Sequence, residues 1–229
     1  MEYLVTAALI VMTIGSYILS RRICLQYQHP LLNVIALSSA SIMILLVVLD
    51  IPYESYKPGK DIMTALLGPT TVALAVPLYS NRAILKKHLL SIALVVLMAS
   101  TVTSLAAMAI VQMVGLPQDV VVSIGPKSVT APVAAEVARI NGGDPGLAIA
   151  FVVMTGVLGA TFGPLLLTLL RVHSPLIRGL ALGTVSHGQG TAIALLEGER
   201  QGTMAGIGMA VSAIITSTMF PAILPIVLS

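Results

Sequence analysis

A lysine and several hydroxyl side chains interrupt a long apolar region in segment 122–132, which reads VSIGPKSVTAP. The glycine and two prolines of this segment favour a break in the helix. Irregular backbone at membrane depth must be buried in protein or face a watery cavity. The ammonium group of Lys127 and free N–H groups at a half-helix N-terminus suit a small anion. The alternative is a shallow lysine that extends to the membrane interface. The residues expected to bind are Gly125, Pro126, Lys127, Ser128 and Thr130.

A second segment, 183–191, carries a histidine among glycines in another apolar stretch. Glycines leave the backbone open to a ligand, and histidine titrates near physiological pH. We therefore expect His187 to contact substrate or carry a coupling proton. The alternative is a histidine that hydrogen-bonds a neighbouring helix in a seam of small residues. The residues of this segment expected in the site are Ser186, His187, Gly188 and Thr191.

A third break is expected where a Gly-Pro pair interrupts the apolar stretch 62–79. Segment 68–72 (GPTTV) and segment 125–129 (GPKSV) share a G-P-x-[ST]-V pattern. Many transporters consist of repeated halves with broken helices at matching positions, so the pattern suggests a duplication and an inverted repeat. The residues that this segment adds to the expected site are Gly68, Pro69, Thr70 and Thr71.

Glu136 follows Lys127 along the chain, and Arg139 lies one helical turn later. The i,i+3 spacing favours an ion pair within the helix. The alternative is a proton-relay role for Glu136, because carboxylates buried in transporters often carry protons.

Catalytic and metal-binding patterns are missing from the sequence. Three of the four histidines lie at the ends of apolar stretches, and no HExxH, GxSxG or P-loop motif occurs. We expect no enzyme activity, no metal and no cofactor.

The elements that would position these residues are membrane helices. Of the 229 residues, 57% are hydrophobic and 9% are charged, and the mean hydropathy is +1.00. Apolar stretches close to the length of one bilayer crossing recur along the chain. We expect an all-α, polytopic bundle in one domain, 1–229, with about eight spans, some of them discontinuous. The expected spans are 3–20, 31–49, 62–79, 88–114, 119–140, 146–170, 176–196 and 204–228.

The twelve basic residues are scattered over the loops, which argues against a nucleic-acid surface and makes them informative about orientation. Eight alternating spans put most of them in odd-numbered loops, with Lys57, Lys60, Arg171 and Arg178 on the other side. The positive-inside rule then favours cytoplasmic odd-numbered loops and both termini outside the cytoplasm. Cys24 is the only cysteine, which excludes an intrachain disulfide.

Three long motifs resemble the LrgB/CidB family of membrane proteins, and the similarity extends over essentially the whole chain. They are LGPTTVALAVPLY at 67–79, PKSVTAP at 126–132 and RGLALGTVSHG at 178–188. Two family positions differ: the family's KSVTTP has Ala131 here, and its TASH has Val185, so one hydroxyl group is missing.

The resemblance implies two competing functions. Bacterial members are named holin-like or antiholin-like regulators of murein hydrolase export and cell lysis, acting with a small LrgA/CidA-type partner. Plant plastid members are glycolate/glycerate transporters, and some bacterial pairs are linked to pyruvate movement. A lysine and a histidine in broken spans favour the transporter, because a holin has no need of them.

We therefore predict a carrier for small monocarboxylates in the cell membrane, with proton coupling through His187 or Glu136. In this hypothesis Lys127 and nearby backbone amides bind the carboxylate, and Thr70, Thr71 and Ser128 bind the substrate hydroxyl. The expected partners are the lipid bilayer, a small organic anion, a second copy of the chain in a dimer and an LrgA/CidA-type protein. The alternative is the holin-like lysis function.

Overall fold

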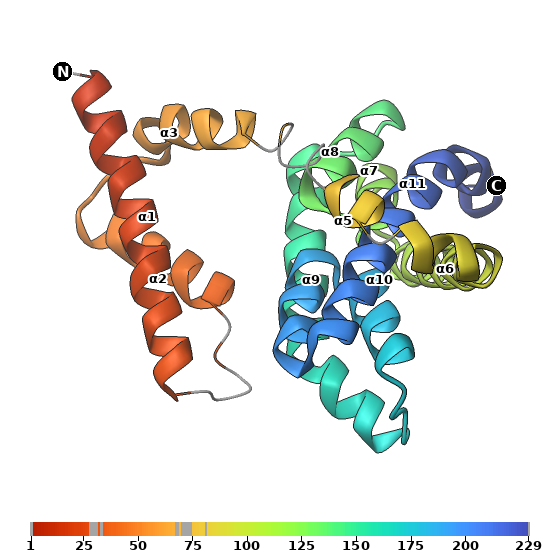
Figure 1. Ribbon diagram of the computed structural model, residues 1–229. Helices are drawn as coiled ribbons and strands as arrows, with labels where there is room; N and C mark the ends of the chain where they lie inside the picture. Colours follow the sequence, from red (N-terminus) through yellow and green to blue (C-terminus); the bar gives the residue numbers. More distant parts are fainter. Residues whose placement is uncertain are drawn as a thin grey trace. The chain divides into compact units, whose positions relative to one another are not determined.

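The computed structural model describes residues 2–27, 32, 34–66, 69, 75–80 and 82–228 (Figure 1). The chain divides into two compact units, Met1–Thr70 and Thr71–Ser229. The described residues form helices, loops and turns without a strand, which confirms the predicted all-α class. The prediction of one domain over 1–229 stays a prediction.

The first unit consists of helices α1 (Glu2–Tyr27), α2 (Val34–Val48) and α3 (Tyr53–Ala65), with α1 in contact with both others. Thr13 of α1 and Tyr56 of α3 have their hydroxyl oxygens 3.1 Å apart. Helix α3 is polar and contains Pro58. It extends from the segment between the predicted spans 31–49 and 62–79 into the start of the second of these, whose middle lies outside the described residues.

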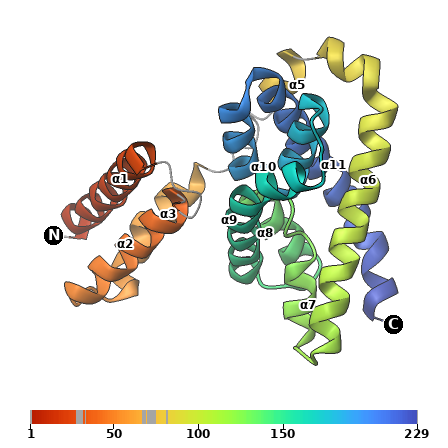
Figure 2. The same ribbon diagram turned by 90° about the horizontal axis from the view of Figure 1, so that it is seen from below.

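The second unit contains the other helices that the structure describes. They are α5 (Ala75–Ser80), α6 (Arg82–Met113), α7 (Gln118–Ile124), α8 (Ala131–Ile140), α9 (Pro145–Leu169), α10 (Pro175–Glu197) and α11 (Glu199–Leu228). Helix α10 packs against α9 and α11, and α6 packs against α11, as both views show (Figures 1 and 2).

Length and apolar composition allow four of the described helices to cross a membrane: α1, α6, α9 and α11. Each has a continuous apolar stretch that matches the hydrocarbon thickness. A polytopic helical membrane protein, as predicted, is therefore confirmed.

Helix α10 is a hairpin bent at its centre. His187 has φ 41° and ψ −123°, far from helical values, and Arg178 near the start pairs with Glu197 at the end, Nη2 to Oε1 2.6 Å. A straight helix would separate two residues 19 positions apart by roughly 28 Å. The predicted span 176–196 therefore enters and leaves the unit at the same end, and the prediction of a single crossing there is wrong.

Helices α7 and α8 form a second hairpin around the break at 125–130. Val121 and Val122 of α7 share a hydrophobic core cluster with Val137 of α8. The backbone N–H of Asp144, beyond α8, donates to Ser123 Oγ at 2.7 Å. The predicted discontinuity in span 119–140 is thus present. The two helices fold back on each other as a hairpin instead of together forming one membrane crossing.

The two hairpins enter the second unit from opposite ends. One end, here called the basic end, gathers the start of α6, the α9–α10 turn and the start of α11 around one cavity. The other, here called the far end, gathers Val111 of α6, Val121 of α7 and Ile223 of α11 in one core cluster. Helices α6, α9 and α11 connect the two ends.

This order corresponds to an inverted repeat within 82–197. Helix α6 leads to the α7–α8 hairpin at the far end, and α9 leads to the α10 hairpin at the basic end. This repeat pairs the α7–α8 hairpin with the α10 hairpin, whereas the repeat expected from segments 68–72 and 125–129 stays a prediction. The first copy of the GPxxV pattern, 68–72, lies almost entirely outside the described residues.

The hairpins also regroup the basic side chains of the second unit. Lys86, Lys87, Arg171, Arg178 and Arg200 all belong to the basic end. If eight spans alternated, Arg171 and Arg178 would lie on the other side of the membrane from Arg200. The α10 hairpin returns to the end where it began, so all three residues lie at the same end. Arg139 instead lies in the last turn of α8, in the hairpin at the far end.

Candidate functional site at two hairpin tips

The two hairpin tips meet on one turn of α9. Val129, in the break between α7 and α8, belongs to a buried core cluster with Val152 of α9. His187, at the tip of the α10 hairpin, lies with Nε2 3.1 Å from the carbonyl oxygen of the same Val152. Segments 122–132 and 183–191 therefore both contact Val152, and a shared binding site at this place stays a prediction.

Lys127 lies at the tip of the first hairpin and is partly buried. Its ammonium group donates to Ser128 Oγ at 3.4 Å, the one hydrogen bond of this group within the described residues. No salt bridge to a described carboxylate occurs. An ammonium group has three donors, so Lys127 keeps donors for a further ligand.

Two hydroxyl groups from other helices hold the backbone of this break. Ser104 of α6 donates to the carbonyl oxygen of Gly125 at 2.7 Å. Ser212 of α11 donates to the carbonyl oxygen of Ser128 at 3.4 Å, and its own Oγ lies 3.2 Å from that of Ser100. These bonds satisfy carbonyl groups that the break removes from helical pairing.

Gly125, Pro126 and Ser128 are buried, and their surroundings differ from the expected open binding wall. A Cβ added at Gly125 would overlap the ring of Phe220 and lie 3.0 Å from Met108 Sδ. Gly125 therefore allows close helix packing. Of the predicted binding residues in this segment, Lys127 and Thr130 are the partly exposed ones.

Three buried hydroxyl groups lack a hydrogen-bond partner within the described residues: Thr130, Thr184 and Thr216 Oγ1. Thr130 precedes α8, Thr184 lies on the first limb of α10, and Thr216 lies on α11 one turn beyond Ser212. Buried polar groups in native structures almost always have a partner. Water or a polar ligand would supply the missing bonds.

The α10 tip is held by small residues of α9. A Cβ at Gly156 would lie 2.7 Å from His187 Cε1, and one at Gly159 would overlap Ser186 Oγ. Thr191 donates to the carbonyl oxygen of His187 at 2.8 Å, and Gly188 is exposed. His187 thus has the packed, hydrogen-bonded surroundings that the sequence left open as an alternative, and Ser186 packs closely against Gly159.

Glu136 and Arg139 form the ion pair expected from their spacing. Two hydrogen bonds of 2.9 and 2.6 Å join the guanidinium to the carboxylate, and both side chains are more than half exposed. A relay role for Glu136 stays a prediction. Its carboxylate faces solvent or membrane surface instead of the hairpin tips.

The first predicted site segment cannot be compared with the other two. Gly68, Thr70 and Thr71 lie outside the described residues, and Pro69 is exposed in the first unit. The described residues also hold no group of histidine, cysteine and carboxylate side chains that could bind a metal.

Sequence reasoning missed the residues that support the tips from neighbouring helices. Ser100, Ser104 and Ser212 are hydroxyl residues within uniformly apolar helices. Polar residues within membrane helices generally face the bundle interior, which was the available signal.

Comparisons with known proteins agree with this architecture. The LrgB-like family matches residues 13–226. "Holin-like protein CidB" of Staphylococcus epidermidis is 34% identical over 223 residues, 97% of each chain, and that of Staphylococcus aureus is 31% identical over the same shares. The protein YxaC of Bacillus subtilis is 34% identical over 213 residues, 93% of each chain.

No solved structure matches the chain. The family match and the relatives each extend over more than nine-tenths of it. These matches show that this membrane protein belongs to the LrgB/CidB family.

Proposed function

We propose that this protein is a carrier that moves small monocarboxylates across the cell membrane. The observation that carries the proposal is the meeting of two opposed hairpins on Val152, with Lys127 at one tip. Discontinuous helices that meet near the bilayer midplane form the substrate sites of many secondary transporters.

Lys127 gives the proposed site its preference for anions. A lysine near the bilayer centre costs roughly 2.5–3.5 kcal/mol on insertion scales, so a partner of opposite charge is expected. Within the described residues its one partner is the neutral Ser128 hydroxyl. A substrate carboxylate would offset this cost and accept the remaining donors.

The unpartnered hydroxyl groups suit the rest of such a substrate. Thr130 belongs to the same break as Lys127, and Thr216 lies near Ser212, which bonds that break. A 2-hydroxy or 2-oxo acid such as glycolate, glycerate or pyruvate has an oxygen next to its carboxylate. That oxygen could pair with one of these hydroxyls.

Proton coupling is assigned to His187 in this proposal. The Nε2–Val152 contact joins the histidine to the turn of α9 that packs against the other tip. A change in this hydrogen bond would alter how the α10 hairpin packs on α9. The second copy and the LrgA/CidA-type partner are assembly proposals that the transport site does not require.

The membrane orientation follows from the regrouped charges. Lys86, Lys87, Arg171, Arg178 and Arg200 share one end of the second unit, whereas Arg139 at the far end is paired with Glu136. By the positive-inside rule the basic end faces the cytoplasm. Helix α11 then ends outside the cytoplasm, and an outside N-terminus completes the proposed topology.

A holin-like function is the second candidate, and the printed names of the relatives support it more directly than they support a carrier. In this case the protein would act on membrane permeability or murein hydrolase export, together with the small partner. Such a role would make no specific use of Lys127.

Uptake by purified protein in liposomes tests the proposal. The carrier predicts saturable uptake of radiolabelled glycolate, glycerate or pyruvate under a proton gradient, without release of an entrapped fluorescent dye. Dye release without substrate preference would support the holin-like function instead. The carrier proposal would be contradicted if none of the three acids were taken up under any ion gradient, with or without the partner.

A further inference from the structure

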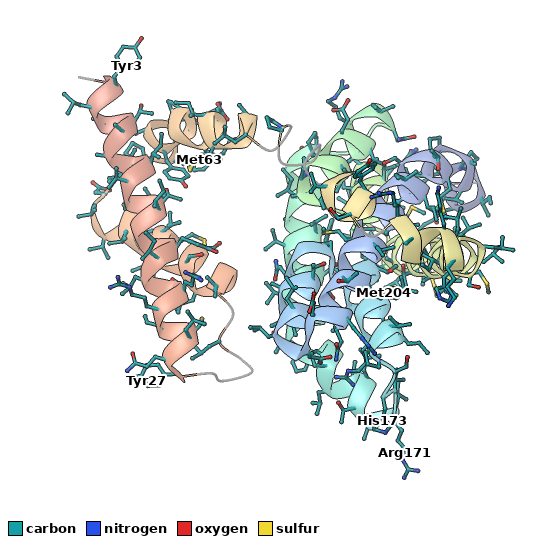
Figure 3. All side chains as sticks on the ribbon, in the orientation of Figure 1. Tyr3, Tyr27, Met63, Arg171, His173 and Met204 are labelled. Carbon is teal, nitrogen blue, oxygen red and sulfur yellow. The ribbon has the colours of Figure 1, made fainter. Side chains whose placement is uncertain are left out.

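A cavity of about 620 Å³ opens at the basic end of the second unit, away from the hairpin tips. The start of α6, the turn before α10 and the first turns of α11 form its walls. Its lining includes Lys87, His88, Ser174, Leu176, Arg200 and Met204, the last of which is labelled in Figure 3. The transport proposal makes no use of this cavity.

The charges in the cavity are mostly positive and unpaired. Lys87 and Arg200 line it together with His88, and Glu199 is the one carboxylate among the lining residues. No salt bridge to Lys87, Arg200 or Glu199 occurs within the described part of the chain, although the pairs Arg178–Glu197 and Arg139–Glu136 are formed nearby and at the far end. Lys87 and Arg200 thus line one cavity, and neither forms a salt bridge with a described carboxylate.

The first turn of α10 adds backbone donors to the same space. Ser174 is the N-cap residue of this helix and lines the cavity, but its side chain makes no capping hydrogen bond. Pro175 follows it, and the next N–H groups at a helix start lack helical partners. Such N–H groups, together with the helix dipole, bind anions.

Apolar side chains form the remaining wall, and Met204 among them is buried. Met204 is 4% exposed and belongs to a core cluster with Ile92 and Ile207. Leu176 and Pro175 complete this side. The cavity therefore combines a cationic rim with an apolar base, which suits a ligand that carries a compact anionic group on an apolar or neutral body.

We propose that this cavity binds a phosphate group at the basic end, held by Lys87, Arg200 and the N-terminus of α10. Arginine pairs with phosphate oxygens through two parallel hydrogen bonds, and lysine adds a point charge. The phosphate can belong to a soluble phosphorylated metabolite or to the headgroup of an anionic phospholipid. Both share the same recognition chemistry, and the bound group would join the starts of α6, α10 and α11.

The test uses the purified full-length protein in two arms. In detergent, inorganic phosphate and glycerol 3-phosphate are titrated while the thermal unfolding midpoint is recorded. In nanodiscs, native mass spectrometry records lipids retained from phosphatidylglycerol–phosphatidylcholine mixtures. The variant Lys87→Gln with Arg200→Gln is compared with Lys86→Gln, which removes a neighbouring charge outside the cavity lining.

The expected result is an about tenfold loss of phosphate affinity, or of phosphatidylglycerol retention, in the double variant and little change in Lys86→Gln. Loss in the detergent arm identifies a soluble phosphate ligand, and loss confined to the nanodisc arm identifies a lipid. The proposal is overturned if wild-type protein binds neither probe, or if Lys86→Gln loses as much as the double variant. Neither outcome depends on transport activity, so this test is independent of the test of the carrier proposal.

Discussion

Lys127 is the residue on which the chemistry of the proposed site depends. Its ammonium group lies at a hairpin tip, partly buried, with the neutral Ser128 hydroxyl as its hydrogen-bond partner within the described residues. A cation that served only the fold would be expected to have a carboxylate partner. Removing a partly buried, unpaired charge should therefore leave folding intact or improve it.

Replacing Lys127 with methionine is expected to keep the unfolding temperature at or above the wild-type value. The apolar side chain fills a similar volume, and the cost of removing the charge from water disappears. Thermal unfolding in detergent measures this effect, with Lys86→Met as the control at an exposed position. A clearly lower unfolding temperature for Lys127→Met alone would show that the lysine has a structural partner.

Gly125 illustrates a residue whose role is packing. A Cβ there would overlap the Phe220 ring, whereas nothing lies within 4 Å of a Cβ at Gly15 in α1. Gly125→Ala should destabilise the protein by about 1–3 kcal/mol through overpacking. Gly15→Ala should be neutral or stabilising, because alanine favours the helix. Equal effects of the two substitutions on thermal unfolding would argue against this close contact.

At the scale of elements, the α10 hairpin is the feature that changes the topology most. Its limbs are closed at the base by Arg178 and Glu197, which are 13% and 20% exposed, and by hydrogen bonds from Arg178 to Val172 and Thr168. This cluster ties the α9–α10 turn to both limbs. The tip at His187 is thereby presented to α9 from the basic end.

A short bifunctional maleimide should cross-link Arg178→Cys to Glu197→Cys in a Cys24→Ala background. The 2.6 Å ion pair joins the ends of these two long side chains, so the positions lie within reach of such a reagent. In a straight helix they would be roughly 28 Å apart. A gel-shift or mass measurement detects the link. Arg178→Cys with Arg139→Cys joins opposite ends and should stay unlinked, and absence of the 178–197 link would support a crossing span.

For the whole molecule, the hairpins decide which loops share a membrane side. Two segments that hydropathy counts as spans return to the end where they entered, so loops after them do not alternate as expected. The basic end then collects lysine and arginine residues from the start of α6, the α9–α10 turn and the start of α11. The resulting charge difference between the two ends is larger than the one obtained from the sequence.

Cysteines at positions 171 and 200 should react with a membrane-impermeant maleimide from the same side of the membrane, and a cysteine at 139 from the opposite side. Inside-out and right-side-out vesicles distinguish the sides. Arg171→Cys and Arg200→Cys are separated by the α10 hairpin, so their shared accessibility follows from it. Labelling of 139 and 200 from one side, with 171 from the other, would support the alternation of simple spans.

Much of this organisation could be predicted from the sequence, because composition alone requires a membrane bundle and the Gly-Pro-Lys and Gly-His segments mark broken helices. The hairpins could not, because an apolar stretch of about 20 residues reads the same whether it crosses or turns back. His187 is one residue with a positive φ inside an otherwise helical pattern. The supporting serines of α6 and α11 needed tertiary contacts to be recognised.

The central claim is tested most directly by solute uptake into liposomes. Matched samples contain wild-type protein, Lys127→Ala or Lys86→Ala. Radiolabelled glycolate, glycerate or pyruvate outside and a neutral dye inside are followed together. The carrier predicts selective uptake by wild type and Lys86→Ala, a loss of at least about tenfold in Lys127→Ala, and retained dye in all three. Uptake or dye release that is equal in wild type and Lys127→Ala would contradict the anion site at the hairpin tips.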